Sequence, residues 1–117
     1  MEFKRQPTFE TIIRRASALG LPIAEFAFEG TKRNPVPNPP FLVYLKEEHA
    51  HGHDSGNAVI EIEGSLELYT ERKPAKTWEQ RIERDVLYDV EDDKQQAKIE
   101  SERIVQTAYD FTIIQKG

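Results

Sequence analysis

The sequence predicts one α+β domain, in which two helices pack on one face of a mainly antiparallel sheet. From residue 58 to residue 70 apolar and polar residues alternate, which is typical of a half-buried strand. After Pro74 the apolar residues recur every fourth position, which is typical of one side of a helix. The chain has 117 residues and no cysteine, so it can bury a core without disulfides. The predicted order is helix, three strands, helix, two strands, within one domain over residues 1–117.

A first helix is predicted over residues 8–19, after a flexible N-terminus of residues 1–7. Its apolar side chains fall on one face, and they are Phe9, Ile12, Ile13, Ala16 and Leu19. Thr8 is a suitable N-cap, and Gly20 can adopt the left-handed conformation that ends a helix. Arg14 and Arg15 are expected to face water.

The next segment, IAEFAFEG, is predicted to be the first strand, with Ala24, Phe26 and Phe28 on one side. Residues 31–40 contain four prolines and are predicted to form a stiff, extended crossover to the second strand. A second use of residues 34–40, as a ligand for a proline-recognising partner, remains an alternative.

The segment FLVYLKEE is predicted to be a central strand, because its first five residues are all apolar and need cover on both faces. Two short helices do not cover both sides of a sheet of this size. A neighbouring subunit is therefore expected to supply a second layer. Phe41, Val43 and Leu45 are the candidate interface residues on this strand.

The segment HAHGHDSGN, residues 49–57, is predicted to be the polar tip of a hairpin, and it contains all three histidines. Imidazoles at alternate positions of an extended chain project to one side and can bind zinc or nickel. His49, His51, His53 and Asp54 are therefore the candidate metal ligands. Since no cysteine or second cluster accompanies them, the sequence predicts neither a native metal nor another cofactor.

The strand from residue 58 to residue 70 directs one set of side chains to the core, namely Ile60, Ile62, Leu66 and Leu68. If straight it would span about 40 Å, which is more than a small domain needs. Either a bend or bulge near Gly64, or a hairpin that projects beyond the body, is expected. Glu61, Glu63 and Glu67 lie on the other side and are further candidates for a subunit interface.

A second helix is predicted from about residue 74 or 77 to residue 88, with Thr77 and Gln80 as a capping box. Trp78, Ile82 and Val86 are expected to pack on the sheet. The charged residues are expected to point outward, and they are Glu79, Arg81, Glu83 and Arg84.

The last two strands differ in polarity. The segment YDVEDDKQQAKIESER is too polar for a central strand, so an edge strand is expected there. The segment IVQTAYDFTII is predicted to be a buried strand, with Val105, Tyr109, Phe111 and Ile113 on one face.

The charge balance argues against tight nucleic-acid binding. Lys and Arg number 16 against 21 Asp and Glu, for a net charge of -5, and the two signs are mixed along the chain. Phosphate backbones are bound by clustered Lys and Arg, which this chain lacks. The sequence also lacks an apolar leader or a membrane-length apolar run, which predicts a soluble, cytoplasmic protein.

No motif in the sequence predicts catalysis. The serines have no nucleophile-elbow pattern, and neither a P-loop nor a G-x-G-x-x-G motif occurs. The glutamates at positions 61, 63 and 67 have the spacing of a solvated strand face. The expectation is that the protein is not an enzyme.

The motif LYTERK leading into an amphipathic helix, followed by IESERIVQTAYDFTII, resembles the small tail-terminator or head–tail joining proteins of siphophages and Gram-positive prophages. The resemblance covers residues 8–115. It implies two helices on one side of an antiparallel sheet, and subunits that form a ring, usually a hexamer, which stops growth of the tail tube. The implied partners are the tube protein and a head–tail connector protein, with DNA passing through the lumen without specific binding. The implied location is the host cytoplasm during assembly and then the virion tail.

Three other functions remain open. The first is another head–tail connector component. The second is a metal-dependent hydrolase that uses the loop from His49 to Asp54. The third is a regulatory module that recruits partners through residues 34–40.

Overall fold

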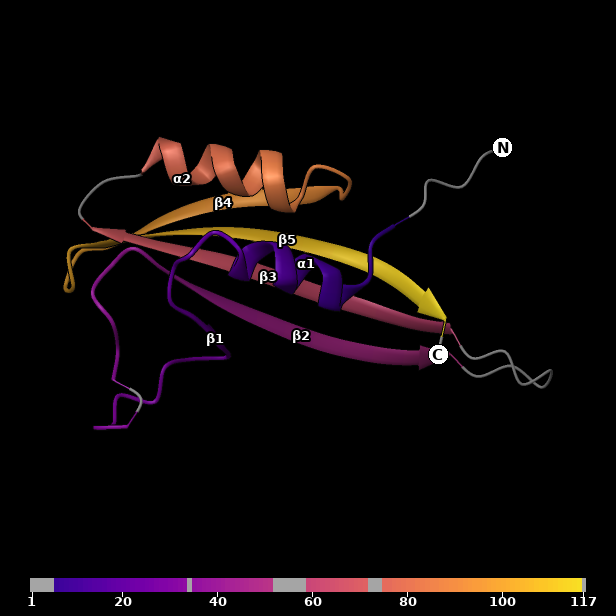
Figure 1. Cartoon of the computed structure of the whole chain (residues 1–117), viewed down its shortest axis with the longest axis horizontal. Coiled ribbons are helices and arrows are strands. Elements are labelled where there is room, and N and C mark those ends of the chain that lie inside the picture. The colour runs from indigo at the N-terminus through magenta and orange to yellow at the C-terminus, as the bar shows by residue number, and fades with distance from the viewer. Residues whose placement is uncertain (1–5, 34, 52–58, 72–74, 117) are drawn as a thin grey trace.

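The computed structural model describes residues 6–33, 35–51, 59–71 and 75–116, which form a five-stranded sheet with helices on one face (Figure 1). The elements in chain order are α1 (Phe9–Ser17), β1 (Ile23–Glu25), β2 (Phe41–His51), β3 (Val59–Glu71), α2 (Lys76–Arg81), the π-helix η1 (Ile82–Val86), β4 (Asp92–Ile99) and β5 (Ile104–Lys116). The strand order across the sheet is β1-β2-β3-β5-β4, with β1 parallel to β2 and the other pairs antiparallel. The predicted α+β class is confirmed. Most of the predicted flexible N-terminus and of the hairpin tip lies outside the described residues.

Helix α1 begins and ends for the predicted reasons, but it is shorter than predicted. The Thr8 hydroxyl accepts a hydrogen bond from the Thr11 backbone N–H at 3.1 Å, which caps the first turn. Gly20 has a φ of +86°, so it adopts the left-handed conformation close behind the helix end. Phe9, Ile12 and Ala16 are buried against the sheet.

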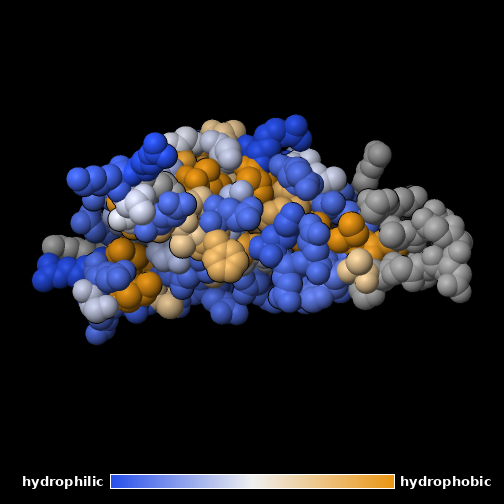
Figure 2. Space-filling view, turned by 90° about the horizontal axis from the view of Figure 1, so that it is seen from below, coloured by the Kyte–Doolittle hydropathy of each residue, from blue (hydrophilic) through white to orange (hydrophobic). Residues whose placement is uncertain are grey.

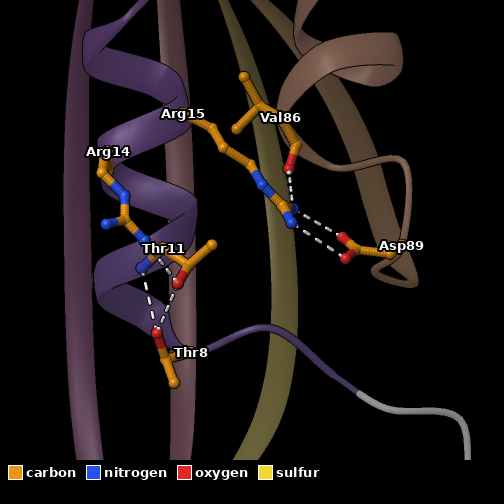
Figure 3. Close-up of polar contacts among 6 residues, drawn as sticks. All are labelled: Thr8, Thr11, Arg14, Arg15, Val86 and Asp89. Carbon is orange, nitrogen blue, oxygen red and sulfur yellow. Dashed lines mark hydrogen bonds and ion pairs between the residues drawn. The ribbon is translucent and has the colours of Figure 1, made fainter.

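The prediction that Arg15 faces water is wrong, because its side chain is only 21% exposed and its guanidinium is held by other residues. It contacts both carboxylate oxygens of Asp89, at 2.8 and 3.2 Å, and it donates to the Val86 carbonyl at 3.2 Å (Figure 3). The hydrogen bond to Asp89 raises the pKa of Arg15. A two-pronged contact of this kind fixes the angle between two groups, so Arg15 ties α1 to the turn after η1.

The long central strands contain no bulge, so the first of the two predicted alternatives, a bulge near Gly64, does not occur. The tip of the hairpin, which the second alternative concerns, lies outside the described residues. The β2–β3 ladder runs unbroken from Phe41 opposite Tyr69 to His51 opposite Val59, and the β3–β5 ladder is equally regular. The strands curve along their length, and the molecule is 51 Å long, which accommodates a strand of 13 residues (Figure 1).

Gly64 has a packing role instead. A Cβ at this position would lie 2.6 Å from the Phe111 ring and 2.9 Å from the Phe9 ring. The glycine therefore lets two aromatic rings, one from β5 and one from α1, lie directly against the strand.

The second helix begins within the predicted range, at Lys76, but differs from its prediction in its capping and in one side chain. Ala75 occupies the N-cap and no side chain caps it, so the predicted capping box does not form. Ile82 and Val86 are fully buried as predicted. Glu79 was expected to point outward, yet it is only 6% exposed.

The reason for the inward position of Glu79 is Lys94 of β4. The ammonium group of Lys94 lies 2.7 Å from Glu79 and 3.0 Å from Glu83, and the Tyr109 hydroxyl donates to Glu83 at 3.0 Å. Among the described residues, the second oxygen of Glu79, Oε2, is the one buried side-chain atom without a hydrogen-bond partner. Lys94 thus holds the helix on the sheet through two carboxylates.

Strand β1 is shorter than predicted, because Phe26 ends it. Its backbone N–H still donates to the Tyr44 carbonyl, but its φ is +71°, and its side chain is 73% exposed. The proline-rich segment then crosses to β2, with a cis peptide bond between Pro39 and Pro40. At the other edge of the sheet β4 is exposed almost throughout, as predicted, and β5 is buried on one face.

Candidate interface on the open face of the sheet

The two faces of the sheet have different surroundings. Strand alternation directs Ile62, Leu66 and Tyr109 to one face, which α1, α2 and η1 cover, and we call this the covered face. The opposite face carries no helix in the described part of the chain, and we call it the open face. It includes all six interface candidates predicted from the sequence, namely Phe41, Val43, Leu45, Glu61, Glu63 and Glu67.

At one end of the open face the chain covers its own apolar residues. The Phe41 ring stacks on the Tyr69 ring at 4.9 Å, and the Phe28 ring meets it edge-on at 5.4 Å. Val43 lies between Ala24 and Glu67 in neighbouring strands. Phe41 and Val43 are therefore buried within a single copy, and Leu45 is half-buried.

Glu67 belongs to a hydrogen-bonded group beside this apolar end. The Tyr69 hydroxyl donates to Glu67 at 3.0 Å, and the Gln106 amide donates to the Tyr69 hydroxyl at 3.0 Å. Burial raises the pKa of Glu67, and burial, with the Glu67 charge, raises the pKa of Tyr69 to about 12. Glu67 is thus a positioned carboxylate rather than a freely solvated one.

The middle of the open face forms a broad, acidic hollow of about 1080 Å³. It runs from Phe26, beside β1, to Glu91 and Asp93, at the start of β4. Its lining includes further carboxylates on the central strands, from Glu47, Glu63 and Asp110. Asp93 and Asp110 lie directly opposite each other in the β4–β5 ladder. Like charges placed directly opposite repel each other, so this surface carries a strong negative field.

Large continuous apolar areas are absent from the side of the molecule seen in Figure 2, as far as its described residues show. Hydrophilic residues predominate there, and hydrophobic residues form small separate areas. The large apolar side chains that are most exposed among the described residues are Phe26, Val36, Tyr88 and Ile114. On this side, the described residues therefore do not form one extensive hydrophobic surface of the kind that marks many protein interfaces.

Of the four predicted metal ligands, His49 is the one whose side chain the structure describes. His49 lies on the open face, and its Nε2 atom is 3.5 Å from Glu63 and 3.8 Å from Glu47. The backbone of His51 ends β2, whereas His53 and Asp54 lie outside the described residues. Glu47 did not emerge from the sequence pattern. The hairpin register contained the signal, since a ladder symmetric about the tip places Glu47 opposite Glu63.

No protein-family model matches the chain, and no curated protein matches it either. Within the described residues, none of the helices has the length and apolar character needed to cross a membrane.

Proposed function

We propose that this chain is a structural tail protein of a phage or prophage, a tail terminator whose copies form a ring on the end of the tail tube. The observation that carries the proposal is the asymmetry of the sheet. One face is covered by the chain's own helices, and the other is open, hollowed and acidic. This arrangement agrees with what the resemblance to tail-terminator proteins implies, and it suits a protein that acts by assembly rather than catalysis.

A closed ring of identical copies needs two different contact patches on each copy. Phe26 and Tyr88 are suitable centres for these patches. Phe26 follows β1, at one edge of the sheet, and Tyr88 lies between η1 and β4, at the other edge. Both are apolar or amphipathic rings with more than half of their surface exposed, at 73% and 61%. Head-to-tail contact between these two edges would close a ring. It would cover the Phe26 end of the hollow and leave the middle of the open face of each copy uncovered.

The acidic open face suits the lumen of such a ring. Asp93, Asp110 and Glu63 present carboxylates across neighbouring strands. A phosphate backbone is repelled by such a surface and does not bind to it, so DNA can slide through. The partners of the ring would be the tube protein on one side and a head–tail connector protein on the other. The protein would act in the host cytoplasm during assembly and remain in the virion tail.

The proposal is tested by adding the purified chain to purified tail tubes. Electron microscopy should show a ring of added density at one end of each tube. Light scattering over a wide concentration range should show a higher-order species at least at high protein concentration or when tubes are present as template. Monomers that never cap a tube would refute the proposal. Binding to an isolated connector, but not to tubes, would instead favour a neighbouring connector component.

A further inference from the structure

We infer that Glu47, His49 and Glu63 form a binding site for a divalent transition-metal ion, with Zn²⁺ as the best match. The three side chains come from two adjacent strands and lie on the open face. This inference is independent of ring formation and of any role in a phage tail.

The geometry of the three side chains is close to that of a zinc site. One ligand atom from each residue lies within 4.8 Å of the other two. The His49 Nε2 atom is 3.5 Å from the Glu63 carboxylate and 3.8 Å from the Glu47 carboxylate. Tetrahedral zinc, with bonds of about 2.0–2.1 Å, places its ligand atoms about 3.4 Å apart. Small side-chain rotations are therefore enough to close the site around an ion.

The backbone holds the three residues in place without help from an ion. Glu47 lies directly opposite Glu63 in the antiparallel ladder, and His49 is two residues further along the same strand, on the same face. An ion would therefore not have to order a loop, which lowers the entropic cost of binding.

Electrostatics also favours a cation here. Two glutamates directly opposite each other are mutually destabilising, and the acidic hollow adds Asp110 nearby. Lys46, the neighbour of Glu47 in sequence, points to the covered face, where its ammonium group lies 2.9 Å from Glu48. Its charge is thus paired on the other side of the sheet, and a bound cation would neutralise the pair of glutamates directly.

The ligand types select the class of ion. One imidazole and two carboxylates suit zinc and similar first-row ions, whereas Ca²⁺ and Mg²⁺ prefer oxygen ligands alone. Because the site has three protein ligands and faces solvent, water can complete the coordination.

The test is calorimetric titration of the untagged protein, purified without metal-affinity resin, with zinc chloride. We expect one ion per chain, and Co²⁺ should give the intense visible absorption of a tetrahedral complex. His49→Ala and Glu63→Gln should each weaken zinc binding by more than about tenfold, since even indirect support of a ligand contributes that much. Glu48→Gln is the matched control, because it changes an exposed neighbouring glutamate on the covered face, and it should bind zinc normally.

A variant with His51→Ala and His53→Ala separates this site from simple chelation by the histidine-rich segment. If this double variant loses zinc while Glu63→Gln binds normally, the inference is wrong and the histidines alone hold the ion. An absence of stoichiometric binding by the unchanged protein would overturn it too. Weaker binding by both His49→Ala and Glu63→Gln, with far-ultraviolet circular dichroism unchanged, supports the inference whatever the double variant does.

Discussion

The covered and open faces are built from the same strands, yet they have different surroundings. On the covered face, Ile62 and Leu66 are buried under the helices. The buried carboxylate of Glu79 forms an ion pair with Lys94 there. On the open face, one residue away along the same strands, carboxylates line a hollow and Asp93 faces Asp110. In the middle of the sheet, strand alternation thus separates the buried residues from the exposed carboxylates, whereas at the end with Phe41 and Val43 both faces contain buried residues.

The largest difference between the faces should appear in a pair of adjacent substitutions. Leu66→Ala removes a fully buried side chain and should lower the free energy of unfolding by about 2–5 kcal/mol. Ser65→Ala, next to it on the open face, should change this free energy by no more than about 0.5 kcal/mol. Urea denaturation followed by circular dichroism measures both. Similar losses in the two variants would mean that the open face also belongs to the core.

Removal of the Lys94 charge should produce the next largest effect. Lys94→Met leaves the buried Glu79 carboxylate without its cation, which should cost about 1–3 kcal/mol of stability. Adding Glu79→Gln should restore much of the loss, because the uncompensated charge is then gone. Lys46→Met, which breaks an exposed ion pair on the same face, should cost no more than about 1 kcal/mol. A double variant as unstable as Lys94→Met alone would show that the lysine acts through packing, not charge.

Alkaline pH should affect a tyrosine on each face. Burial, with a nearby glutamate, raises the pKa of Tyr109 on the covered face and raises that of Tyr69 on the open face to about 12. A phenol whose pKa is raised by folding stabilises the protein below the unfolded pKa of about 10. That stability is lost as the pH rises through the folded pKa. The urea midpoint should therefore fall steadily above about pH 10.

The titration can be followed by the ultraviolet absorbance of tyrosinate together with circular dichroism. Tyr109 is fully buried, so its ionisation should accompany unfolding. Tyr69 is half-buried, so it should ionise at a pH at which more of the protein is still folded. Tyr109→Phe should remove the phase that coincides with unfolding. If every tyrosine ionises near pH 10 in a protein that is still folded, the description of both sites is wrong.

The sequence predicted the strand faces well, because alternation depends only on neighbouring residues. Glu79 shows the limit of this reasoning, since its inward position depends on Lys94, which lies on a different element. Phe26 was assigned to a strand because its pattern continues that of Ala24, but its left-handed conformation ends the ladder. The histidines were noticed as a run along the chain. For His49, one neighbour, Glu47, lies two residues away on the same strand, and the other, Glu63, is brought near by pairing across the hairpin, which composition does not contain.

The central claim, that the open face is the working surface of the assembled ring, is tested most directly by charge reversal in the hollow. The variant with Asp93→Lys and Asp110→Lys changes two exposed side chains that line the hollow. Neither belongs to the core or is a ligand in the inferred zinc site. A control with Glu10→Lys and Glu100→Lys changes the net charge equally, on α1 and in the β4–β5 turn. Both proteins should unfold within about 0.5 kcal/mol of the parent.

The deciding measurement is the yield of DNA-filled, infectious particles when each protein complements a tail preparation that lacks the terminator. The account predicts normal yield from the control and a large loss from the hollow variant, because lysines in the lumen would hold the DNA. Equal yields from the two variants, with both folded, would contradict it and leave the open face without a role in assembly.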